Sequence, residues 1–280
     1  MKASSDRPKA KERTGANNVF SRVLVGVDGS PESGEATRQA ALLLEDEGEL
    51  TLLSAYDTAP ALVGGTGSRV PAYFDEDVQR KQAEDALRRV LEQIQGHSSP
   101  MAKVVRGNSW QELIREAERG RATLIAVGSH GIGRRRGIVV GSTATEVLHK
   151  APCSVLVARR ARPDFPRRIS VGVDGSPESG LAYAVARDVA DRYSAEFWPI
   201  VAHGSKGVDK RLVAEIVDHR HEVLPDEPVP ALVASAADGD LLVVGSRGLH
   251  GLKSLGSVSE RVAHQARSSV LVVRNGGRGS

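Results

Sequence analysis

The chain is poor in the features that mark secreted, metal-binding and membrane proteins. It has only one cysteine, Cys153, so no internal disulfide can form, which suits a reducing compartment such as the cytoplasm. Its eight histidines are scattered rather than clustered at metal-ligand spacing, so we expect no metal site. No run of eighteen apolar residues occurs, and the polar N-terminus does not resemble a secretory signal. We therefore expect a cytoplasmic protein that does not enter a membrane.

The folded part of the chain also lacks a strong net charge. The sequence pI is about 9.1 and the formal net charge is +3. Residues 1–18 hold five basic and two acidic residues, an excess of three that equals the net charge of the whole chain. Because the remainder is close to neutral, a nucleic-acid partner is not expected. Few apolar side chains occur in residues 1–21, so we predict a disordered basic tail there, and a flexible tail over 275–280.

A repeat divides the rest of the chain into two copies. The ten residues VGVDGSPESG occur at 25–34 and again, without a change, at 171–180. VGSHG at 127–131 matches VGSRG at 244–248, and SVLVAR at 154–159 matches SVLVVR at 269–274. Three matching segments in the same order indicate a duplication. We place the first domain at 22–160, a short exposed linker at 161–167 and the second domain at 168–274.

The second copy is shorter than the first. Asp28 lies 100 residues before Gly128, whereas Asp174 lies only 71 residues before Gly245, so 29 residues are missing. The segment VLPDEPVPALV at 223–233 has three prolines where a central strand and a helix should be, and proline suits only the edge of a sheet.

Short apolar runs alternate with amphipathic segments along both copies. In the first copy, strands are predicted near 23–27, 50–55, 101–105, 124–127 and 154–158, with helices starting at Pro31 and near 76, 110 and 142. In the second, strands are predicted near 169–173, 241–244 and 269–273, with a helix from Pro177 to about Arg192. This alternation predicts an α/β fold: two tandem, doubly wound, mostly parallel five-stranded sheets with helices on both faces.

A glycine pattern in the first copy carries the clearest chemical signal. Gly128 and Gly131 follow a buried strand, and after nine further residues Gly141, Ser142 and Thr143 open a helix. Glycines let the backbone approach a ligand closely, and the N–H groups of such a turn and of a helix start favour phosphate. No lysine precedes the serine, so the pattern differs from the GxxxxGK[ST] loop of ordinary NTPases.

Asp28 is the second candidate in the first copy. It follows the first strand directly, and ligands of open α/β sheets bind at the carboxyl ends of strands, where the glycine pattern also lies. Asp28 could instead merely cap the next helix. His130 lies inside the glycine pattern. We interpret it as a solvated loop residue rather than a catalytic base, because no carboxylate partner is evident in the sequence.

Together these motifs resemble the universal stress protein family. Its ATP-binding members carry G-x2-G-x9-G-(S/T), which Gly128, Gly131, Gly141 and Ser142 match without a gap, and Ala151-Pro152-Cys153 matches the turn before the family's last strand. The resemblance implies a Rossmann-like fold of the adenine-nucleotide α-hydrolase type. It also implies ATP as ligand, with or without Mg²⁺, with Asp28 against the nucleoside, the backbone of Ala55 against the adenine and the glycine loop on the phosphates.

The second copy departs from this pattern. Only seven residues separate Gly248 from Gly256, two fewer than in the first copy. The resemblance implies a possible second nucleotide site at Asp174, Gly245, Gly248, Gly256 and Ser257, and leaves open whether it binds.

Three functions fit the sequence. The first is an adenine-nucleotide-binding regulatory protein with little or no turnover, which we expect not to be an enzyme and which signals through its conformation or oligomeric state. The second is a slow ATPase or autokinase, although no general base or magnesium-binding carboxylate is obvious. The third is a nucleotide-free dimerisation scaffold. Since the family uses its last strands to form dimers, the resemblance also implies that 154–158 and 269–273 pair within the chain as a pseudo-dimer, and a homodimer of whole chains is a further possibility.

Overall fold

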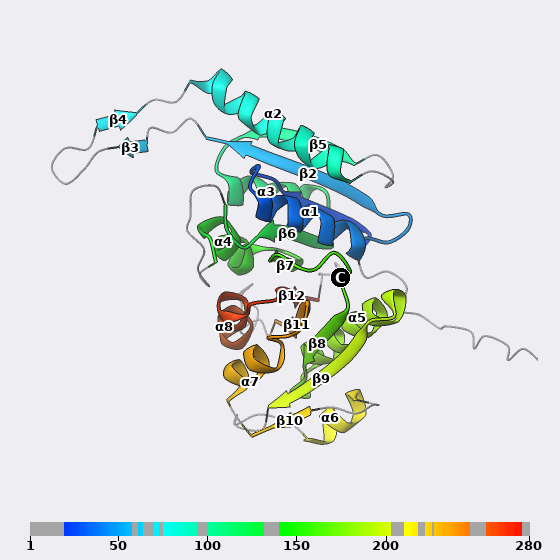
Figure 1. The fold of residues 1–280 in the computed structure, drawn as a ribbon. Coiled ribbons are helices and arrows are strands. Elements are labelled where there is room, and N and C mark those ends of the chain that lie inside the picture. The colour runs from blue at the N-terminus through cyan, green and yellow to red at the C-terminus, as the bar shows by residue number, and fades with distance from the viewer. Residues whose placement is uncertain are drawn as a thin grey trace, which may run out of the picture.

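One sheet of ten strands runs through the chain, which gives the protein an elongated α/β architecture (Figure 1). The structure, a computed structural model, describes residues 20–57, 61–63, 70–72, 75–94, 100–131, 140–202, 210–217, 222–225, 227–246 and 256–275. We call residues 20–160 the first half and residues 168–275 the second half. Each half contributes five strands, as predicted, but the two sets are joined into a single sheet.

The first half follows the predicted alternation closely. Its sheet strands are β1 (Arg22–Gly26), β2 (Glu49–Tyr56), β5 (Met101–Arg106), β6 (Leu124–Gly128) and β7 (Ser154–Ala158). Its helices are α1 (Pro31–Leu43), α2 (Glu76–Gln93), α3 (Ser109–Arg119) and α4 (Ser142–Lys150). An additional pair of short antiparallel strands, β3 (Ala61–Val63) and β4 (Val70–Ala72), lies in the long polar stretch before α2 and was not predicted.

The second half is a reduced version of the first. Its strands are β8 (Arg168–Gly172), β9 (Glu196–Ala202), β10 (Glu222–Leu224), β11 (Leu241–Gly245) and β12 (Ser269–Val273). Its helices are α5 (Pro177–Tyr193), α6 (Lys210–Ile216), α7 (Pro228–Ser235) and α8 (Ser257–Gln265). The proline-rich segment supplies the three-residue β10 at the edge of the sheet and the first turn of α7, where proline is tolerated. No residue ranges were predicted from the sequence for β9, β10, α6, α7 and α8.

The strand order is β10-β9-β8-β11-β12-β7-β6-β1-β2-β5, and every pair except β12–β7 is parallel. Buried side chains alternate along the strands, so that Val23 and Val25 face one core while Leu24 faces the other. Helices α1, α2, α5 and α6 pack on the first face, and α3, α4, α7 and α8 pack on the second. The fold is therefore doubly wound, and each half is covered on both sides.

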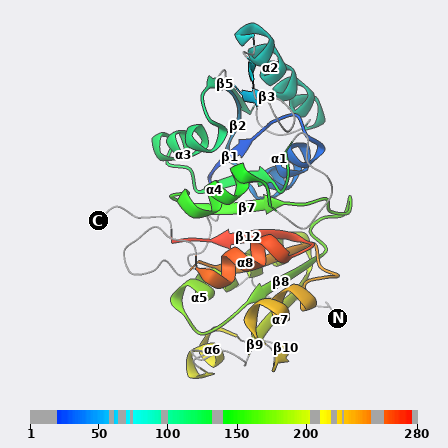
Figure 2. The same cartoon turned by 90° about the vertical axis from the view of Figure 1, so that its left-hand side faces the viewer.

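The two halves meet where β7 and β12 lie side by side and run in opposite directions (Figure 2). Leu156 stands opposite Leu271 in this ladder, and all residues of both strands are buried. These are the two strands whose pairing the family resemblance implied.

Two arginines that follow the paired strands cross from one half to the other. Arg159, after β7, donates hydrogen bonds to the carbonyls of Ala263 at 2.6 Å and Ser268 at 3.2 Å, near the end of α8. Arg274, after β12, donates to the carbonyls of Leu148 and Ala151 at the end of α4. Burial lowers the pKa of Arg159 to about 10 and also lowers the pKa of Arg274. Each guanidinium thus satisfies carbonyls that a helix end leaves without partners.

Two predictions about the connecting segments are wrong. Phe20 is only 2% exposed and packs in the core, so the predicted tail over 1–21 ends at least two residues too late. The linker is not simply exposed, because Phe165 and Pro166 are buried and the guanidinium of Arg38 lies 5.6 Å from the Phe165 ring centre. The arginine-rich composition suggested solvent exposure, but the seam between the halves buries part of it. Residues 1–19 and 276–280 lie outside the described part of the chain.

Candidate functional site

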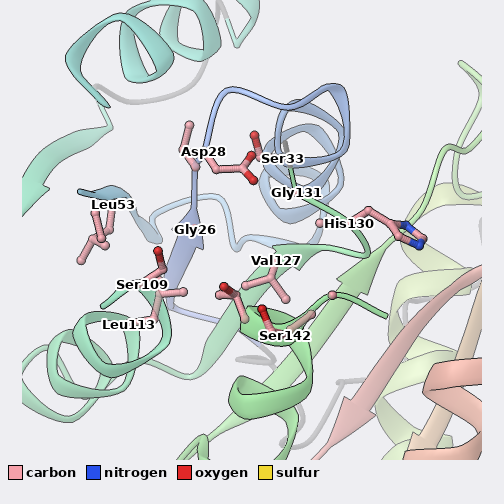
Figure 3. Close-up of a pocket in the computed structure, with 16 residues that line it drawn as sticks. Gly26, Asp28, Ser33, Leu53, Ser109, Leu113, Val127, His130, Gly131 and Ser142 are labelled. Atoms are coloured by element: carbon pink, nitrogen blue, oxygen red, sulfur yellow. The ribbon is translucent and has the colours of Figure 1, made fainter. Parts of the chain in front are cut away.

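A pocket of about 320 Å³ opens at the carboxyl ends of β1, β2, β5 and β6 (Figure 3). Its volume lies at the lower end of the range typical of small-molecule sites. The parallel pairing of these strands brings their ends to the same edge of the sheet. All seven residues predicted for the first nucleotide site line this pocket, namely Asp28, Ala55, Gly128, Gly131, Gly141, Ser142 and Thr143.

Asp28 has one oxygen engaged and one that faces the pocket. Its Oδ1 accepts hydrogen bonds from the backbone N–H of Ser30 at 2.9 Å and from the Ser30 hydroxyl at 2.5 Å. The Ser30 hydroxyl in turn accepts from the N–H of Ser33 at 3.1 Å and caps α1. Asp28 therefore organises the turn before the helix, and its other carboxylate oxygen is left for the pocket.

Glycine is required next to this carboxylate. A Cβ placed on Gly131 would lie 2.5 Å from Oδ2 of Asp28, which is closer than such contacts occur in proteins. A Cβ on Gly128 would lie 2.8 Å from the backbone carbon of Glu32 at the start of α1. These two glycines thus let the end of β6 pass close to α1 and Asp28, where a side chain would clash.

Gly141 differs from these two glycines. A Cβ on Gly141 would make only ordinary contacts, the nearest at 3.5 Å to the carbonyl oxygen of Ser129. Its N–H donates to that same oxygen at 2.8 Å, which ties the start of α4 to the end of β6. Gly141 is the N-cap residue of α4 and supplies no side-chain cap, so the first N–H groups of the helix face the pocket without a side-chain acceptor. Such a helix start favours an anion.

His130 does not act on the pocket through its ring. Figure 3 shows the imidazole pointing away from the pocket, and its Nδ1 lies 3.0 Å from the hydroxyl of Ser129. Its Nε2 is buried without a hydrogen-bond partner among the described residues. This geometry provides no general base for a ligand in the pocket.

Nine further residues complete the lining, and among them the sequence had drawn attention only to His130. They are Gly26, Val27, Ser33, Leu53, Ser109, Leu113, Val127, His130 and Ala144. Leu53 and Leu113 form an apolar side, and Ser109 stands where the chain leaves β5 and enters α3. No motif marks Leu53, Ser109 or Leu113. The rule that ligands bind at the carboxyl ends of strands could have found Ser109 if we had applied it to the predicted third strand of the first copy.

The second half preserves part of the same construction. Oδ1 of Asp174 accepts from the N–H of Ser176 at 3.0 Å and from its hydroxyl at 2.6 Å, as in the first half. A Cβ on Gly245 would lie 2.5 Å from the backbone of Glu178, and Gly256 precedes α8 without a side-chain cap. Ser257 opens α8, whereas Gly248 lies outside the described residues.

Comparison with known proteins agrees with this architecture. The sequence model of the universal stress protein family matches residues 20–159 and 202–274, which is more than half of the chain. This chain belongs to the universal stress protein family. A universal stress protein of Mycolicibacterium smegmatis is 30% identical over 286 aligned residues, which cover 90% of this chain and 96% of that protein. A universal stress protein of Mycobacterium tuberculosis is also 30% identical with the same coverage.

Solved structures support the fold alone. A universal stress protein from Archaeoglobus fulgidus superposes with a TM-score of 0.67 at 23% identity and covers 91% of this chain and 96% of its own. A functionally unknown protein from Pseudomonas aeruginosa superposes with a TM-score of 0.65 at 19% identity, covering 92% and 93%. Among the described residues, no helix is long and apolar enough to cross a membrane, and no group of three His, Cys, Asp or Glu side chains is placed to hold a metal ion.

Proposed function

We propose that this universal stress protein binds ATP in the pocket of the first half and acts as a regulatory protein of the stress response with little or no turnover. One observation carries the proposal. Six residues from two separate sequence motifs, together with Ala55 from the second predicted strand, line a single pocket of about 320 Å³. The motifs are 100 residues apart in sequence, so their convergence is a property of the fold.

The phosphates of ATP would lie at the start of α4. Gly128, Gly131 and Gly141 let the backbone approach a ligand there. The first N–H groups of α4 have no side-chain acceptor, and the hydroxyls of Ser142 and Thr143 add donors on the first turn. The nucleoside would lie toward β2, with Asp28 against it and Ala55 at the end of the neighbouring strand. A magnesium ion would arrive with the nucleotide and be held mainly by its phosphates and by water, as Mg²⁺ prefers.

The proposed output is a change of surface or of association. ATP can shift such an equilibrium only by binding one state more tightly than another. Helix α4 connects the pocket to the seam, because its first turn lines the pocket and the carbonyls at its end accept from Arg274. We propose that the intrachain pseudo-dimer formed through β7 and β12 is the unit that responds, in the cytoplasm, either alone or as a homodimer of whole chains.

Calorimetric titration of the full chain with ATP tests the proposal. We expect binding to be lost in Gly141→Val, because the added side chain intrudes on the pocket while the surrounding protein tolerates a Cβ at this position. Gly256→Val is the matched change in the second half. If the wild type binds one nucleotide per chain and Gly256→Val still binds it, the site is in the first half. If the wild type binds two nucleotides per chain, a second site is assigned to Asp174, Gly245, Gly256 and Ser257.

Two outcomes would favour the other functions. A wild-type chain that binds no nucleotide would be a dimerisation scaffold. Steady-state release of ADP that is abolished by Gly141→Val would make the protein a slow ATPase or an autokinase, the latter if phosphate is found on the protein.

A further inference from the structure

Ser109 places a hydroxyl in the pocket at a position that none of the motifs marks. It is the first residue of α3 and lines the pocket opposite the glycine loop. Figure 3 shows its hydroxyl pointing into the pocket, on the same side as Leu53 and Leu113 and away from Gly131. The hydroxyl makes no hydrogen bond within the described part of the chain, and it does not cap α3, whose N-cap residue is Asn108.

The strand order fixes which end of a nucleotide this hydroxyl would meet. Along the sheet the order is β6-β1-β2-β5, so the β5–α3 turn is three strands from the glycine loop that follows β6. Neighbouring strands are about 4.8 Å apart, which puts the two turns roughly 14 Å from each other. With the phosphates at the start of α4, a group on the β5 side faces the other end of the ligand, where the base lies.

The surroundings of Ser109 suit the flat apolar face of a base. Leu113 packs directly on the backbone of β1, since a Cβ on Gly26 would lie 3.0 Å from its Cδ1. Leu53 lines the same side of the pocket. In an apolar slot of this kind, a few well-placed polar groups decide which ligand fits. Helix α3 contributes one polar side chain to this slot, that of Ser109.

The second half provides a natural contrast at the matched position. Leu232 lies over Gly172 as Leu113 lies over Gly26, with a Cβ-to-Cδ2 distance of 2.9 Å. Leu232 is the fifth residue of α7, just as Leu113 is the fifth residue of α3, so the first residue of α7, Pro228, corresponds to Ser109. Proline offers neither a hydroxyl nor a backbone N–H.

We infer that Ser109 contacts the nucleobase in the first-half pocket, and that Pro228 deprives the second half of this contact. This inference rests on the proposed function, because it requires the pocket to bind a nucleotide. A hydroxyl both donates and accepts, so it can pair with the polar edge of a purine.

The test compares Ser109→Ala and Ser109→Pro with wild type by titration with ATP, 2′-deoxy-ATP, 3′-deoxy-ATP and inorganic tripolyphosphate. Proline at the first helical position is compatible with α3, so Ser109→Pro removes the hydroxyl and reproduces the second half. Gln111→Ala is the control, because Gln111 is exposed on the same turn and does not line the pocket. Thermal unfolding of each variant verifies that the fold is retained.

We expect both Ser109 variants to weaken ATP binding by roughly three- to tenfold, as for a lost neutral hydrogen bond. The same factor should hold for both deoxy nucleotides, and tripolyphosphate binding and the Gln111→Ala variant should be unchanged. If the Ser109 variants and wild type bind one of the deoxy nucleotides equally well, the contact is with the ribose. If the variants also bind tripolyphosphate more weakly than wild type does, the contact is with the phosphate end. Either result, or no penalty at all, overturns the inference. A wild type that binds no ATP overturns the proposed function as well.

Discussion

The two halves keep the same turn after their first strand but surround it differently. Oδ1 of Asp28 and Oδ1 of Asp174 accept from the serine two residues later at 2.9 and 3.0 Å, so both turns are built alike. The helices that follow are not alike, because α2 has 18 residues and α6 has 7, while α3 has 11 and α7 has 8. The repeated aspartate is thus first a structural element, whereas the first-half pocket also takes side chains from α3 and from the start of α4.

At the seam, in contrast to the pocket, the two halves make nearly equivalent contacts. Ser269 accepts from the N–H of Arg159 at 2.9 Å, and Ser154 accepts from the N–H of Arg274 at 3.1 Å. The duplication has therefore preserved the contacts that join the halves more strictly than the contacts that form the pocket. This is what we expect if the second half serves chiefly as a permanent partner of the first.

The largest effect is expected where the seam is most buried. Arg159→Met removes the donor to the carbonyls of Ala263 and Ser268, which stay buried without a partner. We expect the free energy of unfolding to fall by about 2–4 kcal/mol, since each unsatisfied group costs roughly 1–3 kcal/mol. The matched Arg274→Met should cost somewhat less, because Arg274 is only half-buried whereas Arg159 is 8% exposed.

Urea unfolding at pH 7 measures these differences. Arg160→Met is the control, since Arg160 is exposed and adjacent to Arg159. If Arg159→Met were no more destabilising than Arg160→Met, the buried guanidinium would not hold the halves together.

The next largest effect concerns ligand affinity, for which we expect Asp28 and Asp174 to differ. Asparagine retains an oxygen that can accept from the serine and so preserves the turn, but it removes the charge and the second carboxylate oxygen. Under the proposed function, Asp28→Asn should raise the dissociation constant for ATP by about tenfold or more, as expected for a lost hydrogen bond to a charged group. Asp174→Asn should leave it within about twofold.

Calorimetric titration of both variants under identical conditions provides the comparison. Equal losses in Asp28→Asn and Asp174→Asn would mean that the second half also holds a nucleotide, and the asymmetry would then concern only the length of its chain.

Much of this fold could be predicted because its signals are local. Buried apolar runs predict the strands, and Ser30 followed by Pro31 predicts the start of α1. Strand β9 escaped prediction because Pro199 lies within it, opposite Val171, and proline normally argues against a strand inside a sheet. The burial of Arg159 could not be predicted either, because it depends on carbonyls more than 100 residues away in the chain.

Part of the candidate site could likewise be predicted from the sequence and part could not. The glycine pattern and Asp28 can be recognised because Gly128 and Gly131 leave too little room for a Cβ and because the Asp28 carboxylate holds the turn before α1. Ser109 and Leu113 enter the pocket through the placement of β5 and α3, and many other residue types would be compatible with that backbone. The loop can therefore be predicted from sequence, whereas the side chains that line the rest of the pocket require the three-dimensional arrangement.

The smallest expected effect concerns two matched histidines near the seam. His149, on α4, has its Nε2 3.1 Å from Oε1 of Glu260, and His264 occupies the corresponding position on α8. Burial lowers the pKa of His264, with smaller contributions in the same direction from Arg159 and His149, while Glu260 opposes them. Because the unfolded chain then binds the proton more readily, this histidine contributes stability above its unfolded pKa of about 6.5, and that stability is lost as the pH falls through the folded pKa.

His264→Gln should therefore flatten the decline of the urea midpoint between pH 7 and pH 5. His149→Gln should reduce the decline less, because it only removes one positive neighbour of His264 and leaves the burial unchanged. If the two variants flattened the profile equally, burial would not be the main cause, and the histidines would titrate as one group shared between the halves. If His264→Gln left the profile unchanged, the acid sensitivity of the protein would arise away from the seam.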